Sequence, residues 1–286
     1  MASLRQIKRR MKSIDNIHKI TKAMGMIASF RFKKAENRFT RSRNYFLEMG
    51  KLIANLSGAA PEIADPLFEK RKTKKKALVV MTGDKGLCGA YNTNLLKETA
   101  IWLKQNSAFE TFLIPVGKIG NDNFKKKNQR VLMAYPEKAM VDLPLAKKLT
   151  KELKDAFLSG KVDSVELLYV TYRAGTAGRS VVMPYLGLSY LLEDAAKQKN
   201  SVDYIYEPDF GTVFLSLVSQ YLEGKIYMTL LESLTSESAA RMMAMKQATD
   251  NAEDVLDSLN LLKNKTRQAT ITRELSEIVS GASVLV

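Results

Sequence analysis

Two long stretches of the sequence place an apolar residue at every third or fourth position, the spacing of a helix that packs along another helix. In the first stretch the register starts at Leu4 and ends at Leu56, and twelve of its sixteen positions are apolar. The sixteen positions are Leu4, Ile7, Met11, Ile14, His18, Thr21, Gly25, Ala28, Phe32, Ala35, Phe39, Ser42, Phe46, Met49, Ile53 and Leu56. Arg and Lys fill the other faces, so the pattern predicts a long coiled-coil helix within residues 1–60.

Three consecutive positions of this register, Thr21, Gly25 and Ala28, carry small residues. Small side chains let a partner helix approach closely, although glycine lowers helix propensity. We therefore expect tight helix packing at this point.

The C-terminal stretch shows the same behaviour within residues 209–286, where nine of thirteen register positions are apolar. The positions are Leu217, Tyr221, Gly224, Met228, Leu231, Thr235, Ser238, Met242, Met245, Thr249, Ala252, Leu256 and Leu259. No proline and one glycine occur between Thr212 and Ser280, so a continuous helix here would be roughly 100 Å long. Two such helices at opposite ends of one chain pair most simply as an antiparallel coiled coil.

The middle of the chain, residues 75–208, has a different pattern of short apolar runs alternating with helical segments. This alternation predicts an inserted α/β domain with a parallel sheet. The expected strands are 77–82, 111–116, 131–134, 165–172 and 180–188, and the expected helices are 93–105, a polar segment up to 127, and 144–158.

Composition limits the kind of protein that this can be. The chain has 286 residues, of which 45% are hydrophobic and 26% charged, so global disorder is excluded. It has one cysteine, Cys88, and one histidine, His18, which excludes an internal disulfide and a Cys/His zinc site. We expect no catalytic residue, no cofactor and no metal.

The net charge of +15 comes almost entirely from residues 1–76, which hold 20 Lys/Arg against 6 Asp/Glu. A basic segment of this kind suits nucleic acid, an anionic membrane or an acidic protein surface. A nucleic-acid-binding coiled-coil protein is therefore an alternative. In a leucine-zipper DNA-binding protein, however, the basic region lies outside the heptad repeats of the zipper. In this chain the basic residues and the heptad repeats overlap.

The turn 83–89 (GDKGLCG) follows the first strand of the middle domain, where an α/β enzyme would hold a phosphate. Its glycines fit neither GxGxxG nor GxxxxGK[ST], so the pattern favours a structural or partner-contacting turn over a nucleotide loop. A Rossmann-type enzyme is the weaker alternative that this turn leaves open. Cys88 has no nearby base in the sequence and suits a packing role better than a nucleophilic one.

The two ends of the chain also resemble a known family. Residues 14–24 (IDNIHKITKAM), 265–275 (KTRQATITREL) and 277–282 (EIVSGA) are similar to the gamma subunits of F-type ATP synthases. The resemblance extends over the whole chain. It includes the turn 83–89 with Asn92 and Asn94, and the segments 206–209 and 237–251.

The resemblance implies a noncatalytic rotor with an antiparallel shaft inside a hexamer of alpha and beta subunits and a Rossmann-like domain that contacts epsilon and the membrane ring of c subunits. It places Met24 and Arg241 in the coupling region of the shaft. It places Arg267, Gln268 and Thr272 against beta-subunit loops, and the loop from Lys85 to Cys88 against an acidic segment of beta. It implies contact with the membrane only through the c-ring, and no nucleic-acid partner.

The N-terminal sequence and the cysteine count also predict where the protein is located. Nothing near Met1 has the apolar core of a secretory signal, and the helical register begins too early for a cleaved leader. A single cysteine also cannot supply the thiol switch that the resemblance implies for chloroplast members. We therefore expect a bacterial-type member on the cytoplasmic side of the cell membrane, held there peripherally.

Overall fold

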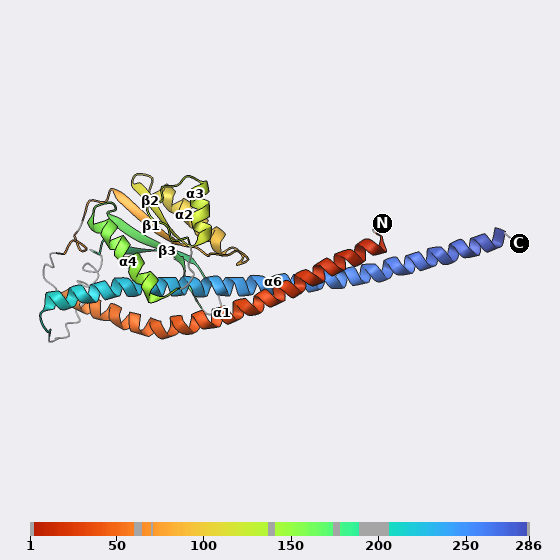
Figure 1. The fold of residues 1–286 in the computed structure, drawn as a ribbon, viewed down its shortest axis with the longest axis horizontal. Helices are drawn as coiled ribbons and strands as arrows, with labels where there is room; N and C mark the ends of the chain where they lie inside the picture. The colour runs from red at the N-terminus through yellow and green to blue at the C-terminus, as the bar shows by residue number, and fades with distance from the viewer. Residues whose placement is uncertain are drawn as a thin grey trace. The chain divides into compact units, whose positions relative to one another are not determined.

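The computed structural model describes residues 3–59, 65–69, 71–136, 141–173, 178–188 and 206–284. The chain forms two long helices, α1 (Leu4–Ala59) and α6 (Phe210–Val284), and between them in sequence an α/β domain with a four-stranded sheet (Figure 1). The chain divides into a terminal unit, Met1–Ser29 with Arg241–Val286, and a central unit, Phe30–Ala240. Both long helices contribute to both units, so the division into 1–60, 75–208 and 209–286 stays a prediction.

The predicted helical registers are confirmed residue by residue. All sixteen register positions of α1 and all thirteen of α6 are buried or half-buried. In the terminal unit the hydroxyl of Thr249 donates to that of Thr21 over 2.9 Å. In the central unit the rings of Phe46 and Tyr221 stack with centroids 5.2 Å apart. In the terminal unit the later residue Gly25 meets the earlier residue Met245. In the central unit Arg38 bonds Tyr227, whereas the later Phe46 meets the earlier Tyr221. The helices therefore run antiparallel within each unit.

Helix α6 begins where its sequence supplies a cap. Asp209 accepts hydrogen bonds from the backbone N–H of Thr212 over 2.9 Å and from the Thr212 hydroxyl over 2.7 Å. These bonds hold the pKa of the Asp209 carboxyl below its usual value, and the bond from the Thr212 hydroxyl has the largest effect.

The sheet of the α/β domain has the order β2-β1-β3-β4, with β1 at Lys75–Met81, β2 at Glu110–Val116, β3 at Ser164–Val170 and β4 at Ser180–Leu186. Strands β2, β1 and β3 are parallel, as predicted. Strand β4 is antiparallel to β3, so the expectation of a purely parallel sheet is wrong at this strand. The short connection between β3 and β4 leaves no room for the crossover that a parallel neighbour needs.

The expected strand at residues 131–134 is not formed. Instead, Val131 and Tyr135 make isolated bridges to Leu113 and Val116 of β2. The backbone N–H groups of Leu113 and Gly117 donate to Arg130 and Tyr135, but Pro115 between them has no N–H to give. The ladder is interrupted at the proline, and the segment still covers the outer edge of β2.

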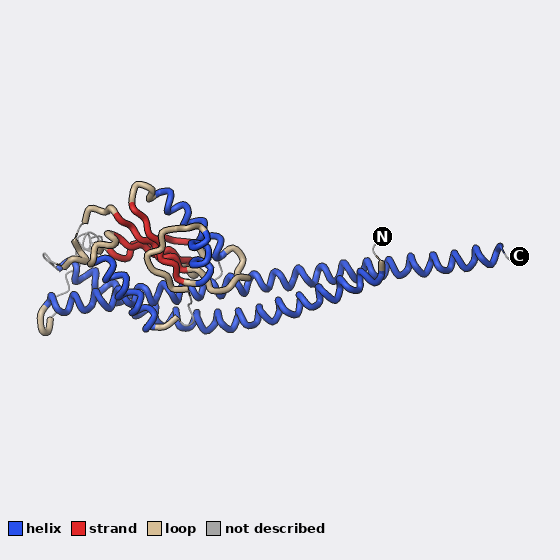
Figure 2. Tube along the Cα trace, turned by 45° about the horizontal axis from the view of Figure 1, so that its top comes forward, coloured by secondary structure: helices blue, strands red, loops and turns tan. Residues whose placement is uncertain are grey.

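Among its described residues the domain also has the helices α2 (Tyr91–Gln105), α3 (Lys118–Lys126) and α4 (Leu143–Leu158). Figure 2 shows the strands gathered in one sheet with helices around it. Leu78 and Val80 of β1 pack in one core cluster with residues of α2 and α3, while Ala77, Val79 and Met81 pack in the other with α4 and α6. Both faces of β1 are therefore buried, as its unbroken apolar run predicts.

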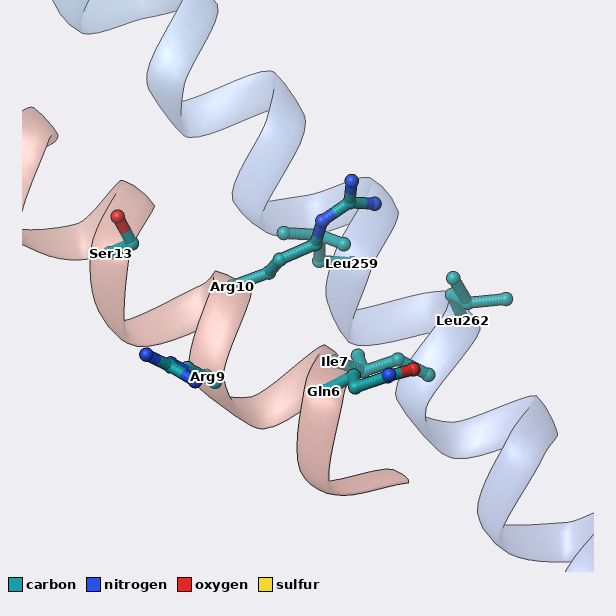
Figure 3. A pocket seen from close by; sticks show the side chains of 7 residues that line it. All are labelled: Gln6, Ile7, Arg9, Arg10, Ser13, Leu259 and Leu262. Atoms are coloured by element: carbon teal, nitrogen blue, oxygen red, sulfur yellow. The ribbon is translucent and has the colours of Figure 1, made fainter. Parts of the chain in front are cut away.

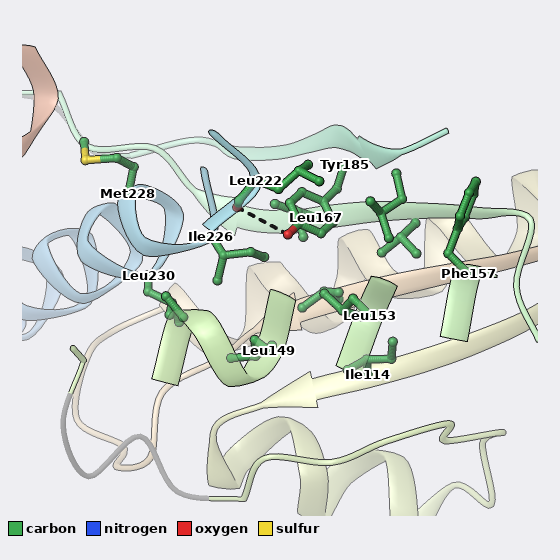
Figure 4. Packing of buried hydrophobic residues seen from close by; sticks show 14 of the residues in the cluster. Ile114, Leu149, Leu153, Phe157, Leu167, Tyr185, Leu222, Ile226, Met228 and Leu230 are labelled. Atoms are coloured by element: carbon green, nitrogen blue, oxygen red, sulfur yellow. Dashed lines mark hydrogen bonds between the residues drawn. The ribbon is translucent and has the colours of Figure 1, made fainter. Parts of the chain in front are cut away.

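Helix α6 is part of the core of the domain. Leu222, Ile226 and Leu230 of α6 are fully buried against Leu149 and Leu153 of α4 and the sheet (Figure 4). The hydroxyl of the buried Tyr185 of β4 donates to the carbonyl of Leu222 over 3.3 Å. Helix α6 thus joins the α/β domain through apolar packing and through directed polar contacts.

Candidate partner-binding surfaces

The loop between β1 and α2, residues 83–89, is held in place by its own neighbours. The amide oxygen of Asn92 accepts from the backbone N–H of Gly83 over 2.8 Å, and its NH2 group donates to the Cys88 sulfur over 3.2 Å. The Asp84 carboxylate accepts from the backbone N–H of Lys118 over 3.1 Å. One face of the loop is therefore fixed to the first turns of α2 and α3.

The opposite side of this loop is exposed. Lys85, Gly86 and Leu87 are exposed, and 58% of the Leu87 surface is accessible although Leu87 has a left-handed φ of 60°. A leucine in that region is strained, so the surrounding contacts must hold the backbone there. The exposed Lys85 can attract an acidic protein surface through charge complementarity. Leu87 lies within the loop from Lys85 to Cys88 that the sequence predicts to meet a partner, whereas Cys88 of the same loop is buried.

The terminal unit presents a second surface along the paired helices. Met24 and Arg241 are half-buried beside the seam. Gly25 lies against α6, and a Cβ built on it would be in ordinary van der Waals contact with Cβ of Met245 at 3.5 Å. The expected tight packing at Thr21, Gly25 and Ala28 is confirmed.

Apolar residues outside the seam distinguish this surface from that of an ordinary coiled coil. Ile20, Met26 and Ile27 of α1 are each more than half exposed, and Met243 of α6 is 48% exposed. Exposed apolar side chains on a helix pair that has already buried its seam indicate a partner surface. These residues lie outside the register positions, so the periodicity of the sequence gives no signal for them.

A groove lies between the helices near the start of α1 (Figure 3). Its volume is about 580 Å³, and it is lined by Gln6, Ile7, Arg9, Arg10, Ser13, Leu259 and Leu262. The side chains of Arg9 and Arg10 are exposed, and Leu262 is 45% exposed. The groove thus combines two guanidinium groups, which suit carboxylates, with an apolar floor.

The last part of α6 has no partner helix among the described residues. All residues from Ile271 to Ser280 are exposed, whereas Thr266 and Thr270 are still half-buried. The predicted contact residues Arg267, Gln268 and Thr272 are exposed on this part of the helix. They share it with a set of exposed apolar residues that the motif did not single out: Ile271, Leu275, Ile278 and Val279.

Most of the groups whose pKa values are shifted line one cavity of the central unit, about 660 Å³ in volume, between α1, β3, β4 and α6. Burial lowers the pKa of Lys225 to about 8, and its Nζ donates to the carbonyl of Pro184 over 2.7 Å. Burial raises the pKa of Glu232. Burial and a hydrogen bond to Glu36 raise the pKa of Tyr172 to about 12, and the same bond lowers the pKa of Glu36. These shifts follow from burial within the contact between the helices and the sheet.

The described part of the chain contains no group of three or more His, Cys, Asp or Glu side chains that could hold a metal ion. Among the described residues, no helix is long and apolar enough to span a membrane.

Comparisons with known proteins are consistent along the whole chain. A protein-family model described as ATP synthase matches residues 3–285. The ATP synthase gamma chain of Paracidovorax citrulli is 39% identical over 290 residues, and that of Polaromonas naphthalenivorans is 40% identical over 289 residues. In both cases the match covers 100% of each chain.

Solved structures show the same fold. A chain of the Euglena gracilis mitochondrial ATP synthase (OSCP/F1/c-ring, rotational state 3) matches with a TM-score of 0.70 at 16% identity, over 99% of this chain and 94% of that one. A chain of the Tetrahymena thermophila mitochondrial ATP synthase (central stalk/c-ring) matches with a TM-score of 0.60 at 22% identity, over 80% of this chain and 99% of that one.

Proposed function

This chain belongs to the family of ATP synthase gamma chains, and from that premise we propose that it is the central rotor stalk of an F-type ATP synthase. In this role it couples proton-driven rotation of a c-ring to ATP synthesis and hydrolysis in a hexamer of alpha and beta subunits. The observation that supports the proposal most strongly is the pairing of two long antiparallel helices in a chain that matches gamma chains from end to end.

The paired helices suit a rotating shaft for a physical reason. A shaft transmits torque only if its two helices cannot slide past each other, and every register position of both helices is buried or half-buried in the seam. A turning shaft can change the nucleotide affinity of three equivalent partners only by presenting a different surface to each. The exposed apolar and basic side chains of the terminal unit provide such an uneven surface.

The contacts follow from this role. Met24, Arg241, Arg267, Gln268 and Thr272 would meet the alpha and beta subunits, together with the groove at Arg9 and Arg10. The loop with Lys85 would meet an acidic segment of beta, while Cys88 supports that loop from inside. The α/β domain would contact epsilon and the c-ring. The chain itself carries out no catalysis and would be held at the cytoplasmic side of the cell membrane through the c-ring.

The alternatives have less support. The relatives and structural neighbours named above are all ATP synthase chains, so they give no support to a nucleic-acid role for the basic helix. A Rossmann-type enzyme needs an open crevice at the carboxyl ends of the strands, and here residues of α6 pack at those ends.

A charge reversal tests the proposed contact of the loop. In a complex reconstituted in vesicles, Lys85→Glu should reduce ATP-driven proton pumping relative to the rate of ATP hydrolysis, because it places like charges against each other at the contact. Lys147→Glu is the matched control, because it reverses the charge of an exposed lysine at a different place, on α4. It should leave the ratio of pumping to hydrolysis unchanged. Unchanged pumping in Lys85→Glu would refute the contact.

A further inference from the structure

The sheet contains the crevice in which open α/β proteins hold their ligands. The chain passes from β1 through α2 to β2 on one side, and β3 lies on the other side of β1. The strand order therefore reverses between β1 and β3, and ligands of such sheets bind outside the carboxyl ends of the strands at this point. In this protein those ends are Met81 and Val170.

Helix α6 fills this crevice with polar side chains. The hydroxyl of Ser233 donates to the carbonyl of Met81 over 3.3 Å and lies 2.7 Å from the hydroxyl of Tyr91, at the start of α2. The Glu232 carboxylate accepts from the backbone N–H of Tyr172, just beyond β3, over 3.0 Å. The neighbouring residues Glu232 and Ser233 of α6 thus make hydrogen bonds to the backbone at the carboxyl ends of β3 and β1.

One turn further along α6, a carboxylate lies against the glycine-rich loop. A Cβ built on Gly83 would lie 2.8 Å from Oε1 of Glu237 and 3.3 Å from the amide oxygen of Asn92, in the first turn of α2. Glu237 is only 7% exposed, and Ser233 is fully buried. In a nucleotide-binding sheet of this kind, an anionic phosphate takes the corresponding place against the first glycine-rich loop.

We propose that α6 occupies this crevice as a built-in replacement for a nucleotide, and that Ser233 and Glu237 are the positioning residues through which the α/β domain turns the shaft. The second part of the proposal rests on the proposed rotor function. Ser233 and Glu237 are four residues apart, so both lie on one face of α6 and meet the domain on successive turns. These directed contacts add to the apolar packing of α6 on the sheet, because a hydrogen bond depends on distance and angle and so fixes the axial position and the rotation of the helix.

Cys88 provides a reporter for the docking of α6. It is the only cysteine of the chain, it is 2% exposed, and it bonds Asn92, which in turn bonds Gly83. If Glu237 holds this loop closed, Glu237→Gln and Tyr91→Phe/Ser233→Ala should each let a maleimide label Cys88 at least about tenfold faster in the folded full-length chain. Labelling is followed by mass spectrometry of the Cys88 peptide.

Tyr135→Phe is the matched control. It also removes a buried tyrosine hydroxyl, but that hydroxyl bonds Glu152 of α4 and not α6. This variant should label at the wild-type rate. We call Glu237→Gln and Tyr91→Phe/Ser233→Ala the docking variants. Equal protection of Cys88 in the wild type and in both docking variants would overturn the docking of α6 by Ser233 and Glu237. If one docking variant fails to fold, as judged by the fluorescence of Trp102, the other still decides.

Coupling tests the second part of the proposal. Complexes in vesicles that contain either docking variant should hydrolyse ATP but pump at least about twofold fewer protons per ATP, because the domain and α6 can then slip. Failure of the wild-type complex to couple would contradict the rotor function itself. Normal coupling by both the wild type and the docking variants would leave that function intact and overturn only the torque-bearing role of Ser233 and Glu237.

Discussion

At the scale of single residues, the clearest energetic signature is the buried lysine of the central unit. Lys225 is 5% exposed, and burial lowers its pKa from 10.5 to about 8. The unfolded chain therefore binds this proton more tightly than the folded chain does. Below about pH 8 the buried charge lowers the free energy of unfolding. As the pH rises from about 8 towards 10.5 the folded chain releases this proton, and the free energy of unfolding increases.

Lys225→Met should remove this pH dependence. The apolar side chain should raise the free energy of unfolding by up to about 3 kcal/mol at pH 7, and the gain should shrink towards zero near pH 10.5. The carbonyl of Pro184, which loses its donor, belongs to an exposed residue and can bind water instead. Urea unfolding followed by Trp102 fluorescence measures the difference at each pH. A difference between the variant and the wild type that does not change with pH would contradict the assignment.

At the scale of elements, two glycines of the helix seam make a matched pair. A Cβ at Gly25 would meet Met245 at 3.5 Å, an ordinary contact, whereas a Cβ at Gly224 would meet the ring of Phe46 at 3.2 Å. Both alanine substitutions gain about 1 kcal/mol of helix propensity. Gly25→Ala should therefore raise the thermal unfolding temperature, and Gly224→Ala should raise it less or lower it, because Phe46 must move from its stack on Tyr221. Equal gains in the two variants would show that the seam is looser than described.

A cross-link tests whether the paired helices move as one element. The hydroxyls of Thr21 and Thr249 lie 2.9 Å apart, so Thr21→Cys/Thr249→Cys should form a disulfide on mild oxidation. Because both helices belong to one shaft, the oxidised complex should hydrolyse ATP at the rate of the reduced one. Inhibition on oxidation that a reductant reverses would mean that the helices shift against each other during turnover.

The sequence predicts these elements well where their periodicity is long. The registers of α1 and α6 are confirmed at every position because a coiled coil repeats one local rule many times. The direction of β4 and the broken strand at residues 131–134 were not predictable in this way. The first depends on which neighbour β4 pairs with, and the second on the missing N–H of Pro115. The contacts of Ser233 and Glu237 join segments that are at least 142 residues apart, so no local pattern could reveal them.

At the scale of the whole molecule, the chain combines a stable α/β domain with helices that expose a large surface. The residues from Ile271 to Ser280 are all exposed, so they add little to the stability of the chain. Deleting residues 271–286 should leave the thermal unfolding of the isolated chain unchanged, while weakening its assembly with alpha and beta subunits, since the exposed leucine, isoleucine and valine side chains are lost. Differential scanning calorimetry and gel filtration of the assembly mixture measure the two effects. A large loss of stability in the isolated chain would show that this segment packs within the chain instead.

The central claim is that this chain turns as a shaft, and single-molecule rotation tests it directly. The alpha and beta subunits of a reconstituted complex are fixed to a surface, and a bead is attached to an exposed residue of α4, such as Lys147→Cys. On addition of ATP the bead should rotate in one direction, at a rate that rises with the rate of hydrolysis. Hydrolysis at the normal rate with a bead that shows only random motion would contradict the account.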